Sequence, residues 1–384
     1  MNAFFHRFGW FFLFGLSGIH LAAAAPLELR VDEAKGTLSV FRAGASAPLL
    51  TQNARPDFRP YLHPINAPDG KGTLTEYSPG HHKHQTGLYW GFTRVNGRDY
   101  FHHPEGDYWK RISIKAGDSH GNQIHWQTVY HLLDEKGQPV LEETQDWTLH
   151  DEGNRYHLDL EWKGKALEKV TIGKYNYGGL FLRMPWRKGI EGGVLNGARQ
   201  KNARAEGQRA NWVDVGMAIE GRKDHGHIAI LDHPDNEAFP QPWRVDGQMG
   251  IGPVRARLGD WHIEKGKTET IRHRVLVYTG DQRDATDDWK AYTGQSGTWA
   301  LWSIAQREGR EAKFLSPQAA VENMTLRDGY EVNLFASEPQ ITQPMAFCWD
   351  DRGRLWIAEN RDYESRGHGF SKFGDSRILI LEDT

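Results

Sequence analysis

The sequence has 384 residues, 25% of them charged, with a formal net charge of −3 at pH 7. A charge balance this close to neutral, without a basic excess, argues against nucleic acid as a partner. The single cysteine excludes an intrachain disulfide, so the chain must depend on a buried core, and its length suggests two domains or one large one.

Residues 1–24 are predicted to be a signal peptide that is cleaved after Ala24. His6 and Arg7 form a short polar start, residues 8–22 are almost wholly apolar, and small residues precede the cleavage point. An apolar run of about 15 residues is too short to span a bilayer comfortably. We therefore expect a periplasmic or secreted protein with no integral membrane segment after cleavage; an uncleaved anchor is the alternative.

Strand patterns dominate residues 25–296. Apolar and polar residues alternate with period two, and turn signals such as Asn96-Gly97 separate the alternating runs. The clearest predicted strands are residues 27–31, 123–130, 155–162, 227–231 and 270–278. Because about 250 residues of this pattern exceed an immunoglobulin-sized unit, we predict an all-β fold, a large two-sheet β-sandwich of the supersandwich kind.

The pattern changes after this region. A helix is predicted at residues 285–292, with Asp284 or Thr286 as its cap and Gly294 as its stop. A second helix, at residues 299–309, lies in a short helical linker predicted at residues 297–316.

Residues 317–384 are predicted to be an incomplete β-propeller segment. Its expected strands resemble one propeller blade, and one blade cannot bury its faces alone. We therefore expect that a C-terminal propeller continuation is missing from this chain. The predicted strands are residues 326–337, 344–349, 355–358 and 378–382.

Several motifs in residues 27–295 carry a family resemblance. They are RPYLHP at 59–64, PDG at 68–70, SPGHHKHQTGL at 78–88, VNGRD at 95–99, GGLFLR at 178–183, WVD at 212–214 and HPDN at 233–236. This region resembles the family labelled "methane oxygenase PmoA". The resemblance implies a galactose-mutarotase-like supersandwich and an association with bacterial sugar-degradation proteins, hence a carbohydrate ligand. Most members have DHPHHRG where this chain has GHHKHQTG at 80–87.

A second resemblance lies in LRDGYEV at 326–332 and GRLWIAE at 353–359. These motifs are similar to the opening of the propeller in planctomycete-type proteins labelled membrane-bound dehydrogenases. Such proteins often continue into helical repeats and a haem-binding Cys-x-x-Cys-His segment, and neither occurs in this sequence. No haem is therefore predicted, and the cofactor stays open.

His82 and His84 are the sharpest local candidates for catalysis. On a strand they would point to the same side, which suits two metal ligands or two imidazoles that contact a sugar. Asp99 and Asp214 are the carboxylates expected to act with them, as acid or base or in a metal shell. Imidazole titrates near neutral pH and suits proton exchange with sugar oxygens. The sequence does not identify a metal.

A further set of residues is predicted to bind the substrate. Arg183 offers a rigid fork of donors to a carboxylate or a sugar hydroxyl, and Trp side chains offer flat surfaces for sugar rings. Core packing is the alternative for each Trp, and a surface salt bridge is the alternative for Arg183. The set comprises His63, Trp90, Arg183, Trp212, His233, Asn236 and Trp243.

Three functional hypotheses follow from these observations. The leading one is an exported protein that binds or processes carbohydrate, with proton-transfer chemistry such as epimerisation or elimination if it is an enzyme. The second is a non-catalytic recognition module of a larger dehydrogenase-like protein. The third is a metal-dependent oxygenase, as the family label implies.

Overall fold

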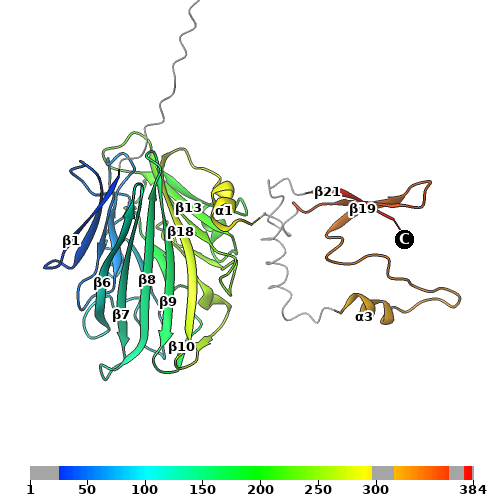
Figure 1. Cartoon of the computed structure of the whole chain (residues 1–384), viewed down its shortest axis with the longest axis horizontal. Coiled ribbons are helices and arrows are strands. Elements are labelled where there is room, and N and C mark those ends of the chain that lie inside the picture. Colours follow the sequence, from blue (N-terminus) through cyan, green and yellow to red (C-terminus); the bar gives the residue numbers. More distant parts are fainter. Residues whose placement is uncertain (1–25, 296–314, 363–375, 383–384) are drawn as a thin grey trace, which may run out of the picture.

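The computed structural model describes residues 26–295, 315–362 and 376–382 (Figure 1). The predicted signal peptide and the predicted helix at residues 299–309 lie outside these ranges. Within them, none of the helices combines the length and the apolar character that crossing a membrane requires.

One eight-stranded antiparallel sheet forms the first layer of a β-sandwich. Its strands come mainly from the first third of the chain, and three later strands extend it on one side. In spatial order they are β1 (Leu27–Asp32), β2 (Thr37–Arg42), β3 (Leu50–Asn53), β4 (Tyr61–Ile65), β5 (Leu88–Gly91), β11 (Gly179–Leu182), β16 (Ile251–Pro253) and β15 (Trp243–Val245).

A second eight-stranded sheet forms the other layer, which Figure 1 shows with its long strands in front. In spatial order they are β12 (Gly192–Asn196), β13 (Trp212–Ala218), β14 (His225–Asp232), β18 (Thr268–Gly280), β9 (Tyr156–Ala166), β8 (Pro139–Asp151), β7 (Gln123–Leu133) and β6 (Trp109–His120). The two sheets confirm the predicted all-β, two-sheet β-sandwich.

Smaller elements complete this region. A two-stranded sheet pairs β10 (Val170–Ile172) with β17 (Trp261–Ile263). Two short 3-10 helices, η1 (Asn202–Ala205) and η2 (Arg255–Leu258), lie in the connections.

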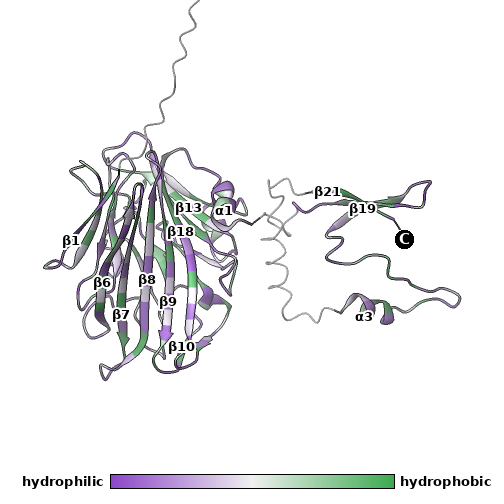
Figure 2. Ribbon diagram, in the orientation of Figure 1, coloured by the Kyte–Doolittle hydropathy of each residue, from purple (hydrophilic) through white to green (hydrophobic). Residues whose placement is uncertain are grey.

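The period-two alternation in the sequence is the physical basis of the long strands. Along β7, β8 and β9 buried and part-buried residues alternate almost without interruption, and Figure 2 shows hydrophobic and hydrophilic residues interspersed along these strands. Successive side chains on a strand point to opposite faces, so one face enters the core.

Large aromatic residues join the two sheets. Trp90 of the first sheet stacks on Trp162 of the second, with ring centroids 4.7 Å apart and planes inclined by 13°. The Nε1–H of Trp126 donates to Gln52 Oε1 across the sandwich at 3.1 Å. Because these rings fill the core between the two sheets, they set the distance between the layers.

Helix α1 (Thr286–Thr293) confirms the helix predicted at residues 285–292. It ends where Gly294 adopts a left-handed φ of 66°, which glycine accepts without steric cost. The predicted cap at Asp284 or Thr286 is wrong: Ala285 is the capping residue, and no side chain caps this end. Asp284 instead accepts the Thr286 N–H just before the helix. Trp289 is wholly buried and anchors the helix through an Nε1–H bond to the Asp232 carbonyl.

The C-terminal ranges contain α3 (Pro317–Glu322), capped by the Ser316 hydroxyl, and the antiparallel strands β19 (Pro344–Trp349), β20 (Leu355–Glu359) and β21 (Arg377–Leu381). The strand predicted at residues 326–337 is wrong, because these residues form turns and irregular backbone. They pair with no described strand, and apolar alternation alone does not make a strand without a hydrogen-bonding neighbour. The described residues form no closed propeller.

One carboxyl group is buried within the sandwich core. Glu143 accepts hydrogen bonds from Trp162 Nε1 at 3.0 Å and Gln145 Nε2 at 2.8 Å. Burial raises the pKa of Glu143 to about 7, although these bonds and the nearby charge of Arg59 act in the opposite direction. In the folded protein the Glu143 carboxyl group therefore stays protonated at pH values where it is ionised in the unfolded chain.

We expect Glu143→Gln to remove a pH dependence of stability. Between pH 4.5, the usual carboxyl pKa, and about 7, the native state binds the extra proton, so wild-type stability falls as pH rises. The wild-type free energy of unfolding should fall by about 3 kcal/mol over that interval, and the variant should not show this fall. Urea unfolding of both proteins at pH 5 and pH 8 measures the two free energies. Equal pH dependence in the two proteins would contradict the assignment.

Candidate functional site

The outward face of the first sheet carries a second apolar cluster, separate from the sandwich core. On β4, β5 and β11 the residues that point away from the core include Tyr61, Tyr89 and Phe181. Phe58 and Phe101 from neighbouring loops pack against them. This cluster forms a rigid base on which the loops of the candidate site rest.

A tight loop carries His82 and His84. Tyr77 and Thr86 form an isolated bridge, and the Ser78 N–H donates to the Gln85 carbonyl at 2.7 Å. Within the loop, further backbone bonds close successive turns. The two histidines therefore lie on a turn and not on a strand, yet their rings lie only 5.7 Å apart.

Arg59 is wholly buried and joins this loop to the next one. Its guanidinium donates to the His84 carbonyl at 2.6 Å and to the Phe101 carbonyl at 2.7 Å, and it lies 3.7 Å from the centre of the Tyr89 ring. Burial lowers the pKa of Arg59 to about 10, so it stays charged at neutral pH. This bridge holds the rings of His84 and His102 at 4.5 Å from each other.

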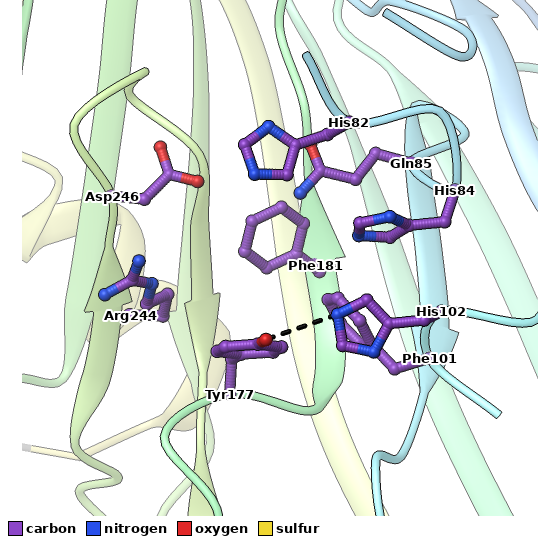
Figure 3. Close-up of a pocket in the computed structure, with 9 residues that line it drawn as sticks. All are labelled: His82, His84, Gln85, Phe101, His102, Tyr177, Phe181, Arg244 and Asp246. Carbon is purple, nitrogen blue, oxygen red and sulfur yellow. Dashed lines mark hydrogen bonds between the residues drawn. The ribbon is translucent and has the colours of Figure 1, made fainter. Parts of the chain in front are cut away.

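The loops enclose a pocket of about 130 Å³ above the apolar cluster. Figure 3 shows histidines on one side, Asp246 and Arg244 on the facing side, and Tyr177 and Phe181 between them. The lining residues are His82, His84, Gln85, Phe101, His102, Tyr177, Phe181, Arg244 and Asp246.

Asp99, His102 and Tyr177 form a hydrogen-bonded chain that ends in the pocket. Figure 3 shows its last bond, between His102 and Tyr177. His102 Nδ1 lies 2.7 Å from Asp99 Oδ2, and His102 Nε2 lies 3.2 Å from the Tyr177 hydroxyl. The carboxylate therefore holds the proton on Nδ1 and leaves Nε2 as the acceptor. Burial opposes ionisation of Asp99, but bonds from the His102 side chain and from backbone N–H groups lower its pKa overall.

The other imidazoles of the pocket are held neutral. Burial, helped by the neighbouring His102 and by the charge of Arg59, lowers the pKa of His84 to about 3, and burial also lowers the pKa of His82. His82 Nδ1 lies 2.8 Å from His81 Nδ1. Within the described part of the chain, no group is hydrogen-bonded to the ring nitrogens of His84, which lines the pocket.

A buried ion pair forms the facing wall. Arg183 Nη2 lies 2.5 Å from Asp246 Oδ2, and Arg183 Nε donates to Gln85 Oε1. Asp246 Oδ1 also accepts the N–H groups of Gln248 and Gly250, which fixes the carboxylate on its turn. Arg183 therefore positions Asp246 and Gln85 from beneath the pocket.

Arg244 completes this wall. Its Nη1 donates to Glu206 Oε1 at 2.8 Å, and its guanidinium lies 5.8 Å from the centre of the Tyr177 ring. Arg244 thus shares a carboxylate that lies outside the pocket with Arg257, whose Nη2 lies 2.5 Å from the same oxygen.

The predicted residues fall into separate places. His82 and His84 line the pocket, Asp99 lies behind His102, and Arg183 lies beneath Asp246. Asp214 lies on the second sheet, where it is buried and accepts bonds from the Tyr278 hydroxyl and Gln282. It is therefore a packing and hydrogen-bonding group of that sheet.

The three predicted tryptophans are buried. Trp90 stacks on Trp162, Trp212 donates to the Thr286 hydroxyl at 3.2 Å, and Trp243 donates to the Ala210 carbonyl. Their indole faces are covered by the protein and none lines the pocket.

The last three predicted residues lie at other positions. His63 lines a second hollow, of about 530 Å³, together with Tyr77 and Arg187. His233 lines a third hollow beside Tyr292. Asn236 is buried and donates to Asp232 Oδ1 at 2.7 Å.

The sequence analysis missed His102, Tyr177, Arg244 and Asp246. His102 carried a usable signal, because Asp99 precedes it by three residues and Asp99 Oδ1 accepts its backbone N–H, as turn-forming aspartates do. Tyr177 and Asp246 carried none, since only the fold brings these distant segments together.

Comparisons with known proteins assign a family and no activity. The model of the family of unknown function DUF6807 matches residues 46–292, more than half of the chain, and the domain of unknown function DUF7133 matches residues 316–384. A comparison with curated proteins found no match in sequence. No methane-oxygenase or dehydrogenase label accompanies these matches, so both resemblances stay predictions.

Solved structures match at low similarity. The galactosidase domain of the α-galactosidase-sucrose kinase AgaSK is 11% identical with a TM-score of 0.36, over 66% of this chain and 42% of that one. The α-galactosidase AgaB of Geobacillus stearothermophilus is 9% identical with a TM-score of 0.33, over 66% and 41%. This chain thus spans less than half the length of these enzymes.

A shorter protein matches over its whole length. A galactose mutarotase related enzyme of Lactobacillus acidophilus is 9% identical with a TM-score of 0.29, over 67% of this chain and 99% of that one. At TM-scores below 0.5 none of these likenesses carries an argument about this chain.

We expect Arg183→Met to destabilise the protein by about 3–5 kcal/mol, because it leaves the buried Asp246 carboxylate without its cation. Adding Asp246→Asn should recover part of this loss. Arg187→Met is the matched control: its ion pair with Glu76 involves a mostly exposed arginine, so it should cost less than about 1 kcal/mol. Chemical denaturation measures all three. Equal losses for Arg183→Met and Arg187→Met would contradict the assignment.

Proposed function

Because this chain belongs to the family of unknown function DUF6807, whose name assigns no activity, we propose a function from the site itself. The pocket binds a small neutral carbohydrate and transfers a proton on it through Tyr177 and His102. The observation that carries this proposal is the hydrogen-bonded chain of Asp99, His102 and Tyr177, which opens into a small pocket.

The geometry defines the proton path. A ligand hydroxyl that contacts Tyr177 passes its proton to the phenol oxygen, while the phenol proton moves to His102 Nε2. His102 becomes an imidazolium, and the Asp99 carboxylate stabilises its charge through Nδ1–H. Burial raises the pKa of Tyr177 to about 12, so a free phenolate is costly and the two transfers occur together.

The chemistry of the lining supports a hydroxyl-rich ligand. Arg183 pairs with Asp246, and Arg244 pairs with Glu206, which Arg257 also contacts. His82 and His84 have lowered pKa values and are neutral. The pocket therefore offers many hydrogen-bonding groups, and the charged groups of its lining already have partners.

The size of the pocket supports a single sugar ring. A volume of about 130 Å³ is below the roughly 300–1,000 Å³ of pockets for drug-sized ligands. The faces of Phe181 and Tyr177 provide an aromatic surface on which a sugar ring can lie.

The reaction class follows from the return of the proton. His102 can give the same proton back, through Tyr177, to another oxygen of the bound ligand. If the proton comes from the anomeric hydroxyl and returns to the ring oxygen, the bond between the anomeric carbon and the ring oxygen breaks and a carbonyl forms. Reclosure of the ring from the other face then epimerises that carbon without net loss of a proton. The predicted signal peptide supports action in the periplasm or outside the cell, which we propose as the location.

We expect aldoses to be bound and isomerised by the wild-type chain. Thermal unfolding against a panel of mono-, di- and keto-sugars identifies the ligand, because a ligand at 100 times its Kd adds about 2.7 kcal/mol of stability. Proton NMR in D₂O then follows interconversion and deuterium uptake. His102→Ala should slow turnover by about 10²–10⁴-fold, the usual contribution of a general base.

Controls separate catalysis from binding and from folding. His84→Ala should weaken binding, whereas His125→Ala, on the second sheet, should change neither binding nor rate. Asp99→Asn should alter the pH profile of the rate, because Asp99 acts through His102. A ligand that binds but is never converted would favour the recognition module, and the absence of any sugar binding would overturn the proposal.

A further inference from the structure

A second group of imidazoles lies on the second sheet, away from the pocket. His150 of β8 and His157 of β9 are direct cross-strand partners, and Asp159 follows two residues later on β9. Residues two apart on a strand share a face, so all three side chains lie on one side of the sheet. We propose that they bind a divalent transition-metal ion. This inference is independent of the proposed function.

The distances suit one shared ion. One possible ligand atom from each of the three residues lies within 4.8 Å of the other two. The two imidazole rings lie nearly parallel, with centroids 4.8 Å apart and an angle of 18° between the planes. Ligand atoms about 2.0–2.2 Å from a zinc ion are separated by less than this distance, so small side-chain rotations bring them to the ion. Among the described residues no other group of three meets the same distance limit.

Arg274 supports the carboxylate from the neighbouring strand. It faces Asp159 across the β9–β18 pair and donates to its two oxygens at 2.6 Å and 2.8 Å. Each carboxylate oxygen has two lone pairs, so Asp159 can keep these bonds and still ligate a metal. Outer hydrogen bonds of this kind orient metal ligands.

Negative charges outnumber positive charges around the site before a cation arrives. Arg274 opposes a metal ion, but Asp159 offsets its charge directly. Glu152 lies 3.3 Å from His157 Nδ1 and also pairs with Arg155, which in turn reaches Asp288. A bound cation therefore faces two arginines and three carboxylates.

The donor set selects the class of metal. Two imidazole nitrogens and one carboxylate oxygen suit Zn²⁺, Cu²⁺ or Ni²⁺, whereas Mg²⁺ and Ca²⁺ prefer oxygen ligands only. Water molecules would complete the coordination shell.

The experiment titrates Zn²⁺ into the tag-free chain in competition with a chromophoric chelator. Wild-type protein should bind one ion at this site, and His157→Ala should weaken that binding by at least about 10-fold, the lower end of what losing even an outer-shell partner costs. His150→Ala should do the same, which guards against one variant that misfolds. Circular dichroism verifies that each variant is folded.

Two control variants locate the ion. His125→Ala removes a histidine of the adjacent strand β7 and should leave Zn²⁺ binding unchanged. His84→Ala removes a histidine of the pocket and should also leave it unchanged. The proposal is overturned if wild-type protein binds no Zn²⁺, if folded His150→Ala and His157→Ala bind as wild type does, or if His84→Ala alone abolishes binding.

Discussion

The candidate site depends on one buried guanidinium. Among the described residues no carboxylate forms an ion pair with Arg59; its charge is stabilised by the carbonyls of His84 and Phe101 and by the face of Tyr89. A buried cation is costly unless such partners are held in place. If the loops that carry His84 and Phe101 moved apart, the buried guanidinium of Arg59 would lose its hydrogen-bond acceptors. The close approach of His84 and His102 follows from that constraint.

Successive side chains of the first sheet point to opposite faces, and this allows one face to pack in the core while the other supports the site. Leu88 and Trp90 of β5 enter the sandwich core, whereas Tyr89 between them points outward and joins a second apolar cluster. A strand with both faces covered has no solvated side, and β5 and β11 are buried along their whole length. The sandwich thus supplies a rigid base, and the loops above it supply the chemistry.

The features that could be predicted from the sequence are those that depend on residues close together in the chain. Period-two alternation identified the long strands, and local spacing drew attention to His82 and His84, which do line the pocket. Alternation failed at residues 326–337, where no neighbouring strand supplies hydrogen bonds. Long-range pairing was beyond a single sequence: Arg183 and Asp246 belong to segments far apart in the chain, and their ion pair exists only in the folded sheet.

Burial sets the charge state of the pocket as well as its shape. In water an imidazole is partly charged near neutral pH, but a buried imidazole beside cations remains neutral, as the lowered pKa of His84 shows. Arg183 pairs with Asp246, Arg244 shares Glu206 with Arg257, and the negative charge of Asp99 offsets that of Arg59 across the loop. A ligand that only donates and accepts hydrogen bonds keeps every pairing intact, and the proposed sugar hydroxyl is such a group.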